Sequence, residues 1–235
     1  MDPSFYSSYY SVPTPTIPTG DRFVLFAKIC FFGFLVYILS DTIIKAHNEF
    51  KVNNTSITTS DITHDATKTI SELTKVDINC SDKTGLNKIK YIDLGGTSNK
   101  FKYEYSCTDD TYLNKDTIYE KETNSTSYGI NNLAGSINML DLQNITCDSN
   151  QILNKFKLEK NSTNSTINYK YNCIQSTRPL ICRRAETSMF QSDDGLKLNN
   201  LKKISPSCNE DEALQSLKFN KIGNFIGYDF TCCKY

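Results

Sequence analysis

Three stretches of this 235-residue chain share one cysteine-bounded pattern, which constrains the fold more than any other feature of the sequence. The stretches cover residues 73–107, 140–173 and 201–233. In each, a leucine stands seven residues before a leading cysteine, and a second leucine, followed by Asn or Gln, stands six residues after it. Agreement at so many fixed offsets indicates an internal repeat.

Each copy ends in residues that alternate between apolar and polar up to a closing cysteine: FKYEYSC, INYKYNC and IGYDFTC. A period of two is typical of a strand with one buried face. The segments IKY, FKL and LKF alternate in the same way and place Lys90, Lys157 and Lys218 on the outer face. Turn-forming residues separate the two predicted strands, so each copy is predicted to be a β-hairpin. Because a lone hairpin is marginal in water, the three hairpins must pack together or on the segments between them.

The alternation also predicts how the cysteines pair, because each closing cysteine lies on the same face as the aromatic residues before it. A leading and a closing cysteine close a loop of roughly 25 residues, which contributes on the order of 3 kcal/mol in the chain-entropy model. The predicted disulfides are Cys80–Cys107, Cys147–Cys173, Cys208–Cys232 and Cys182–Cys233. In this scheme the side chain of Cys233 points to the face opposite that of Cys232. The alternative, in which the last strand ends early and Cys233 pairs with Cys208, stays open.

These units predict an all-β ectodomain, residues 73–235, made of three disulfide-stapled hairpin repeats. One arrangement is a single domain with pseudo-threefold symmetry, trefoil-like or prism-like, and a linear row of three modules is the alternative. The polar segments between the hairpins, residues 108–139 and 174–200, are expected to add short strands and exposed loops.

An apolar run at residues 23–39, interrupted only by Lys28, predicts a transmembrane signal anchor that places the chain in a lipid bilayer. Its length is at the short end of the about 17–25 residues that a spanning helix needs. A cleaved signal peptide is the competing interpretation, but the run exceeds the usual length of about 7–15 residues and no small-x-small cleavage site follows. Arg22 and Lys28 lie toward its N-terminal side, whereas the first charge beyond it is Asp41. The positive-inside rule therefore places the N-terminus in the cytosol.

Eight of the nine cysteines follow the apolar run, and the ninth, Cys30, lies inside it. An even number of cysteines in a long polar region is typical of an oxidising compartment, so this region is expected to be lumenal or extracellular. All matches to the N-x-[ST] sequon also follow the run: Asn53, Asn54, Asn79, Asn124, Asn144, Asn161 and Asn164. Apart from Asn79, these are the candidate glycosylation sites.

The sequence contains no pattern typical of an enzyme. The two histidines, His47 and His64, lie in residues 40–72, a Ser/Thr/Asn-rich segment expected to be a flexible stalk, whereas a catalytic histidine needs rigidly held partners. Phosphate loops, nucleophile elbows and His-rich metal motifs are absent, and the wide cysteine spacing suits disulfides better than zinc. We therefore expect no catalytic residue, metal or other cofactor. The balance of 26 basic and 26 acidic residues removes any charge-based argument for nucleic acid.

One basic cluster, RPLICRR, holds Arg178, Arg183 and Arg184 and is a candidate docking site for an acidic partner or a glycan. A solvated loop held by Cys182 is the alternative interpretation. A lectin-like function would instead use exposed loop aromatics such as Tyr112 or Tyr128.

The pattern of Leu, then Cys, then Leu-x-x-apolar-Lys-apolar and Tyr-x-Tyr-x-Cys resembles a cysteine-bounded repeat in proteins of protists, algae and the large DNA viruses that infect them. It covers residues 73–233. The abundance of Asn, Lys, Ile and Tyr with few Arg is typical of an AT-rich genome, and the N-terminal anchor is similar to those of membrane-tethered minor capsid or envelope proteins of such viruses.

This resemblance implies a non-enzymatic, single-pass type II membrane protein with a structural or assembly role and with capsid or envelope proteins as partners. Residues 1–22, which are rich in Tyr, Ser and Pro, are then a disordered tail in the cytosol or the virion interior. The ectodomain would be lumenal, extracellular, or placed between the viral membrane and the capsid shell. A lectin-like or receptor-binding surface glycoprotein is the alternative.

Overall fold

The computed structural model describes residues 28, 30–40, 54–63, 70–81, 84–95, 100–109, 112–127, 136–192 and 197–234. The chain divides into two units, residues 1–51 and 52–235, and the helix at residues 30–40 belongs to the first. Within the described residues, no helix combines the length and the apolar character needed to cross a bilayer. The expected tail, residues 1–22, and part of the expected anchor, residues 23–27 and 29, lie outside the described residues.

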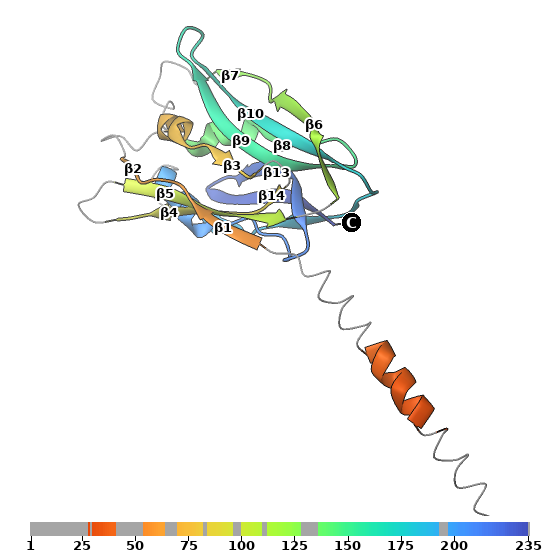
Figure 1. The fold of residues 1–235 in the computed structure, drawn as a ribbon. Helices are drawn as coiled ribbons and strands as arrows, with labels where there is room; N and C mark the ends of the chain where they lie inside the picture. Colours follow the sequence, from red (N-terminus) through yellow and green to blue (C-terminus); the bar gives the residue numbers. More distant parts are fainter. Residues whose placement is uncertain are drawn as a thin grey trace, which may run out of the picture. The chain divides into compact units, whose positions relative to one another are not determined.

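Residues 52–235 are mostly β and contain three antiparallel sheets, one around each predicted hairpin (Figure 1). The first sheet consists of β1 (Asn54–Thr58), β2 (Ile62–Thr63), β4 (Thr84–Asp93) and β5 (Lys100–Asp109). The second consists of β3 (Ile78–Asn79), β6 (Leu113–Glu122), β7 (Thr126–Ser127), β9 (Gln151–Asn161) and β10 (Thr166–Ser176). The third consists of β8 (Asn144–Thr146), β11 (Ile181–Glu186), β12 (Phe190–Gln191), β13 (Ala213–Ile222) and β14 (Phe225–Lys234).

The predicted hairpins are present as β4–β5, β9–β10 and β13–β14. In each sheet the strand that carries the closing cysteine lies between the other strand of its hairpin and a pair of outer strands. The predicted alternation is confirmed in β5, where Phe101, Tyr103 and Tyr105 are buried while Lys102 and Glu104 are partly exposed. A short 3₁₀ helix precedes the leading cysteine of each repeat: η1 (Ile70–Lys75), η3 (Ile137–Leu142) and η4 (Leu198–Lys203).

The expected stalk at residues 40–72 needs correction, because residues 54–63 form outer strands of the first sheet. β1 runs antiparallel to β5 with Ile57 opposite Tyr105, and β2 places Ile62 opposite Phe101. An outer strand buries few side chains, so it can be rich in Ser, Thr and Asn. A flexible linker has the same composition. The segments between the hairpins add strands, as expected, and these are likewise outer strands of the second and third sheets.

A threonine joins the outer strands to the closing strand in every sheet. The backbone N–H of Thr59 donates to the carbonyl of Tyr103 at 2.9 Å, and the hydroxyl of Thr59 accepts the N–H of Tyr103 at 2.9 Å. The same pair of bonds joins Thr123 to Tyr169 and Thr187 to Tyr228. The repeating unit therefore includes the outer strands, which the cysteine pattern did not reveal.

The first strand of each hairpin (β4, β9 or β13), which we call its opening strand, contains a β-bulge. The extra residue of the bulge is the Asn or Gln after the second leucine: Asn87, Asn154 and Gln215. A bulge redirects the side chain out of the regular alternation. The amide of Asn154 crosses to the first repeat and donates to the carbonyls of Ser81 at 3.0 Å and Thr84 at 2.7 Å. The bond to Thr84 is buried, so it satisfies a carbonyl that water cannot reach, whereas the bond to Ser81 is only partly buried.

Equivalent amide bonds connect the other repeats. Gln215 of the third repeat donates to the carbonyls of Asp148 and Gln151 in the second, at 3.2 and 3.3 Å. Asn87 of the first repeat donates to the carbonyls of Asn209 and Glu212 in the third, both at 2.7 Å. The backbone follows the same course, since the N–H groups of the three leading cysteines donate to the carbonyls of the bulged residues: Cys80 to Asn154, Cys147 to Gln215 and Cys208 to Asn87. We call these three sets of bonds the amide clasps.

The three opening strands also meet at one point through equivalent residues, those directly before the second leucine: Gly85, Ile152 and Ala213. A Cβ atom built on Gly85 would overlap the side chain of Ile152 and would lie 2.8 Å from the Cβ of Ala213. One large, one small and one absent side chain therefore fill a space that three large ones could not share.

The four predicted disulfides are all present: Cys80–Cys107, Cys147–Cys173, Cys208–Cys232 and Cys182–Cys233. Strand β14 continues to Lys234, so the alternative in which the last strand ends early is wrong. As predicted, the two neighbouring cysteines point to opposite faces. Cys232 is part of the main core, whereas Cys233 belongs to a smaller apolar cluster with Leu113, Ile152, Ile174 and Ala213.

The clasp of Asn154 predicts a specific loss of stability. Asn154→Ala removes the donor to the buried carbonyl of Thr84 and one donor to the carbonyl of Ser81, so the free energy of unfolding should fall by about 1–3 kcal/mol. The matched control is Asn168→Ala in the same hairpin, because the amide of Asn168 reaches only the exposed carboxylate of Glu122, at 3.4 Å. Denaturant unfolding of both variants measures the difference, and equal losses would contradict the role given to the clasp.

Candidate functional site

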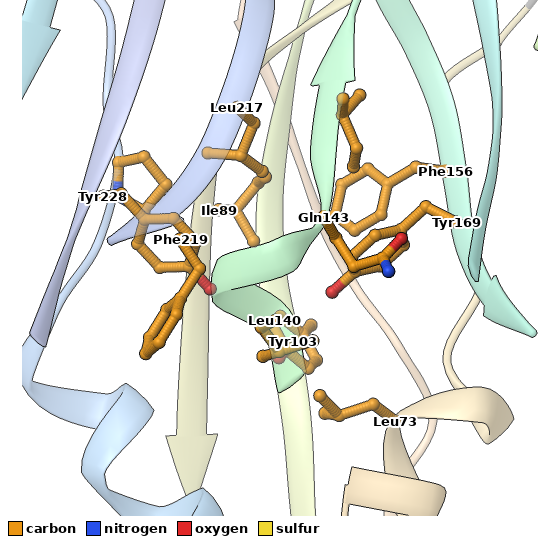
Figure 2. Close-up of a pocket in the computed structure, with 12 residues that line it drawn as sticks. Leu73, Ile89, Tyr103, Leu140, Gln143, Phe156, Tyr169, Leu217, Phe219 and Tyr228 are labelled. Atoms are coloured by element: carbon orange, nitrogen blue, oxygen red, sulfur yellow. The ribbon is translucent and has the colours of Figure 1, made fainter. Parts of the chain in front are cut away.

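The three closing strands each bring one tyrosine to a small cavity between the repeats (Figure 2). These residues, Tyr103, Tyr169 and Tyr228, are the ones that bond to the three threonines described above. The cavity has a volume of about 30 Å³, enough for one or two water molecules. Its walls are mainly apolar and include a second set of equivalent residues: Ile89, Phe156 and Leu217. Figure 2 shows the hydroxyls of Tyr169 and Tyr228 turned toward the space between them.

These tyrosines are held in their neutral form. Burial raises the pKa of Tyr103 well above its ordinary value, and proximity to Tyr228 and Tyr169 raises it further. Burial likewise raises the pKa of Tyr169 and of Tyr228. A phenol that keeps its proton can exchange hydrogen bonds with a small polar guest but cannot serve as a nucleophile or an anionic metal ligand. The cavity is therefore a polar spot within the core, and its hydroxyls are suited to holding water.

Alkaline pH should weaken the fold through these tyrosines. An unfolded tyrosine ionises near pH 10, whereas the folded chain holds its three phenols neutral to higher pH, so above about pH 10 the folded state binds more protons. The contribution of the three phenols to stability is thus complete below about pH 10, and it is lost as pH rises toward their raised pKa values in the folded chain. In the triple variant Y103F/Y169F/Y228F, the difference in unfolding free energy between neutral and alkaline pH should become smaller. Tyr119→Phe is the control, since Tyr119 is 44% exposed, and equal behaviour of the two variants would contradict the prediction.

The predicted docking cluster is divided among three environments. Arg183 binds Glu212 with two bonds, Nε to Oε1 at 2.8 Å and Nη2 to Oε2 at 2.5 Å. The guanidinium of Arg178 lies 3.7 Å from the ring centre of Tyr112, in cation–π geometry. Arg184 is exposed on β11 and has no ion-pair partner among the described residues. All three arginines are exposed, but Arg183 is engaged by Glu212 and Arg178 by the ring of Tyr112.

Glu212 is a buried carboxylate whose role is structural. The hydrogen bonds from Arg183 hold the pKa of Glu212 below its ordinary value, and the backbone N–H of Asn209 adds to this effect. Its carboxylate and the sulfurs of Cys208 and Cys232 lie within 4.8 Å of one another, a grouping that could suit a metal ion. However, the two sulfurs form a disulfide, and only a thiolate is an effective ligand. This cluster therefore supports the turn of the third repeat.

The Arg183–Glu212 pair should stabilise the fold at neutral pH. Arg183→Met leaves a buried carboxylate with fewer donors, and we expect a loss of about 1–3 kcal/mol, because Arg183 is itself partly exposed. Since the pKa of Glu212 is lowered by folding, the contribution is present above the unfolded value of about 4.3 and is lost as pH falls through the folded value. Denaturant unfolding at neutral and acidic pH tests this, with Arg184→Met as the control. A loss in Arg183→Met that persisted unchanged at acidic pH would contradict it.

An open depression with a volume of about 720 Å³ lies on the outer face of the third sheet. We call it the sheet-three groove. Two rows of polar side chains cross its four strands in register. One row is Thr146, Ser216, Thr231 and Arg184, and the other is Asn144, Lys218, Asp229 and Glu186. The volume lies within the range of about 300–1,000 Å³ that is usual for ligand sites.

The candidate glycosylation sites that the structure describes are all exposed: Asn54, Asn124, Asn144, Asn161 and Asn164. Asn161 and Asn164 lie at the tip of the β9–β10 hairpin, whereas Asn144 lines the sheet-three groove. Asn53, the histidines His47 and His64, and Tyr128 lie outside the described residues. Tyr112, the other loop aromatic, is covered on one ring face by Arg178.

Comparisons of this chain with protein-family models, with curated proteins and with solved structures return no match.

The sheet-three groove was not foreseen from the sequence, because it depends on residues from four strands that are far apart in the chain. The signal that was available is the serine at position 216, where both other repeats carry lysine: Lys88 and Lys155.

Proposed function

We propose that this chain is a non-enzymatic, single-pass type II membrane protein whose disulfide-stapled β ectodomain has a structural or assembly role. The observation that carries the proposal is the division between the two sides of each sheet. Apart from the outward lysine at positions 90, 157 and 218, most residues that recur in all three repeats face inward or form the amide clasps, whereas other outward positions, such as 88, 155 and 216, differ between repeats. Such a division suits a rigid scaffold that presents different surfaces to its neighbours.

We further propose that the three repeats form one closed, prism-like domain with pseudo-threefold symmetry. The amide clasps run from the second repeat to the first, from the third to the second and from the first to the third. Short-strand pairing follows the same course, with β3 on β9, β8 on β13 and a single bridge between Ser207 and Lys88. A linear row of modules would leave the first and third repeats without these mutual contacts.

The proposed anchor rests on the apolar run at residues 23–39, and the compartment rests on four disulfides together with exposed sequons. In line with the resemblance of the repeat, the proposed setting is a virion, where a membrane-anchored minor capsid or envelope protein would bind shell proteins through its ectodomain. In that setting the ectodomain lies between the viral membrane and the shell, or outside the envelope.

Fractionation of material from the source organism tests the proposed anchor and setting. The protein is expected in the membrane fraction after an alkaline carbonate wash and, in the presence of virus, in purified particles at a fixed ratio to the main shell protein. The control is a variant that lacks residues 23–39, which should appear in the supernatant. Release of the full chain by carbonate would exclude the anchor, and its absence from particles would exclude the virion role.

The alternative function is that of a lectin-like or receptor-binding surface glycoprotein, and the sheet-three groove is the observation that favours it. Hydroxyl, amide and charged side chains line the groove, and such groups form the hydrogen bonds by which proteins bind sugars. Binding to a glycan array that is abolished by Thr231→Lys and retained by Asn172→Lys, the equivalent position of the second sheet, would support this alternative.

A further inference from the structure

The three sheets provide an internal comparison for the sheet-three groove. Two positions after the second leucine, the outward residue is Lys88 in the first sheet and Lys155 in the second, but Ser216 in the third. Lys155 crosses its sheet to reach the carboxylate of Asp77 at 3.3 Å. A long side chain at this position occupies the outer face, so the shorter serine leaves space over the third sheet.

The floor of this space is rich in hydrogen-bonding groups. The hydroxyl of Ser216 is bonded to that of Thr231 at 2.8 Å, and Arg184 lies opposite Thr231 on the next strand. Lys218 and Asp229 form the neighbouring row. With a usual strand spacing, the four strands span about 14 Å. The lining includes no exposed aromatic side chain, so the groove is suited to a hydroxyl-rich ligand held by hydrogen bonds.

Asn144 places a modification site in the wall of this groove. It belongs to the sequon Asn-Ile-Thr, and strand β8 turns Ile145 into the core, where it is 1% exposed. Asn144 and Thr146 therefore share the outer face, and the hydroxyl of Thr146 donates to Oδ1 of Asn144 at 3.0 Å. The Nδ2 atom of Asn144, to which a sugar would be attached, has no protein partner among the described residues.

We propose that Asn144 carries an N-linked glycan whose first sugar residues lie in the sheet-three groove. The glycan is tethered at the groove wall, so its binding to the groove is intramolecular and gains from a high effective concentration. Sugar hydroxyls and acetamido groups match the donors and acceptors of Ser216, Thr231 and Arg184. This inference rests on the proposed lumenal or extracellular placement of the ectodomain, since N-glycans are added there.

Of the sequons at the β9–β10 tip, Asn161 lines a smaller polar depression of about 400 Å³, whereas Asn164 is not part of its lining. Asn161 and Asn164 lie at the β9–β10 tip, where the side chain of Asn161 accepts the backbone N–H groups of Thr163 and Asn164 in a tight turn. A glycan on Asn164 would extend into solvent from this turn. It is therefore the internal reference for a glycan that the protein does not bind.

The test is enzymatic deglycosylation of the full chain expressed in eukaryotic cells, followed site by site with mass spectrometry. In the native protein, an amidase that removes N-glycans should release the Asn144 glycan about tenfold more slowly than the Asn164 glycan, as expected for one or two bonds of about 1 kcal/mol. After reduction and denaturation the two rates should become equal. Ser216→Lys, which restores the residue found in the other two repeats, should abolish the protection. Asn172→Lys on the second sheet should preserve it.

The outcomes separate this inference from the proposed function. Equal native release rates, or glycans at Asn161 and Asn164 with none at Asn144, would overturn the groove assignment and leave the membrane topology standing. Absence of glycans from every sequon would overturn the lumenal placement itself, and the groove assignment with it. Slow release that survives Ser216→Lys would overturn the assignment as well, because protection would then come from another part of the protein.

Discussion

The arrangement of the β domain, residues 52–235, depends on three side-chain amides that leave their own strands to bond the backbone of another repeat. Asn87, Asn154 and Gln215 each occupy a β-bulge, and each satisfies carbonyls in the turn that follows a leading cysteine. A hairpin alone cannot exclude water from both of its faces. The amide clasps solve this problem because they hold the inward faces of three hairpins against one another. Disulfides then join the two ends of each hairpin, and the core forms where those closing cysteines meet the aromatic residues beside them.

The three repeats are similar in most of their inward residues and differ at several outward positions, and the small departures from equivalence are informative. Gly85, Ile152 and Ala213 occupy one position of the repeat, yet their sizes are complementary because all three share a single space. On the outer faces, a serine in place of a lysine opens the sheet-three groove. Residues needed for folding are therefore shared by the three repeats, whereas a surface used for interaction can be specific to one of them.

Much of the scaffold could be predicted from the sequence because strand alternation is a local property. Each closing cysteine (Cys107, Cys173 or Cys232) lies on the same strand face as the aromatic residues before it. This was enough to assign all four disulfides, including the one formed by Cys233. The outer strands of the first sheet were missed because β1 has only one apolar residue, Ile57, and its Ser/Thr-rich composition is that of a linker. Arg183 was assigned to docking because its partner, Glu212, is distant in sequence. The groove was missed for the same reason, since its lining comes together only in the folded sheet.

The nested disulfides of the third repeat also determine how the chain would respond to mechanical load. The Cys182–Cys233 loop encloses the Cys208–Cys232 loop, so β14 is joined covalently to β11 from one face and to the segment before β13 from the other. Under tension between the N-terminal unit and the C-terminus, residues inside a closed loop cannot extend, whereas each residue outside one lengthens the chain by at most about 3.6 Å. The force therefore bypasses most of the third repeat. Such a chain would act as a tether of limited extensibility, with the slack confined to the segments between the disulfide loops.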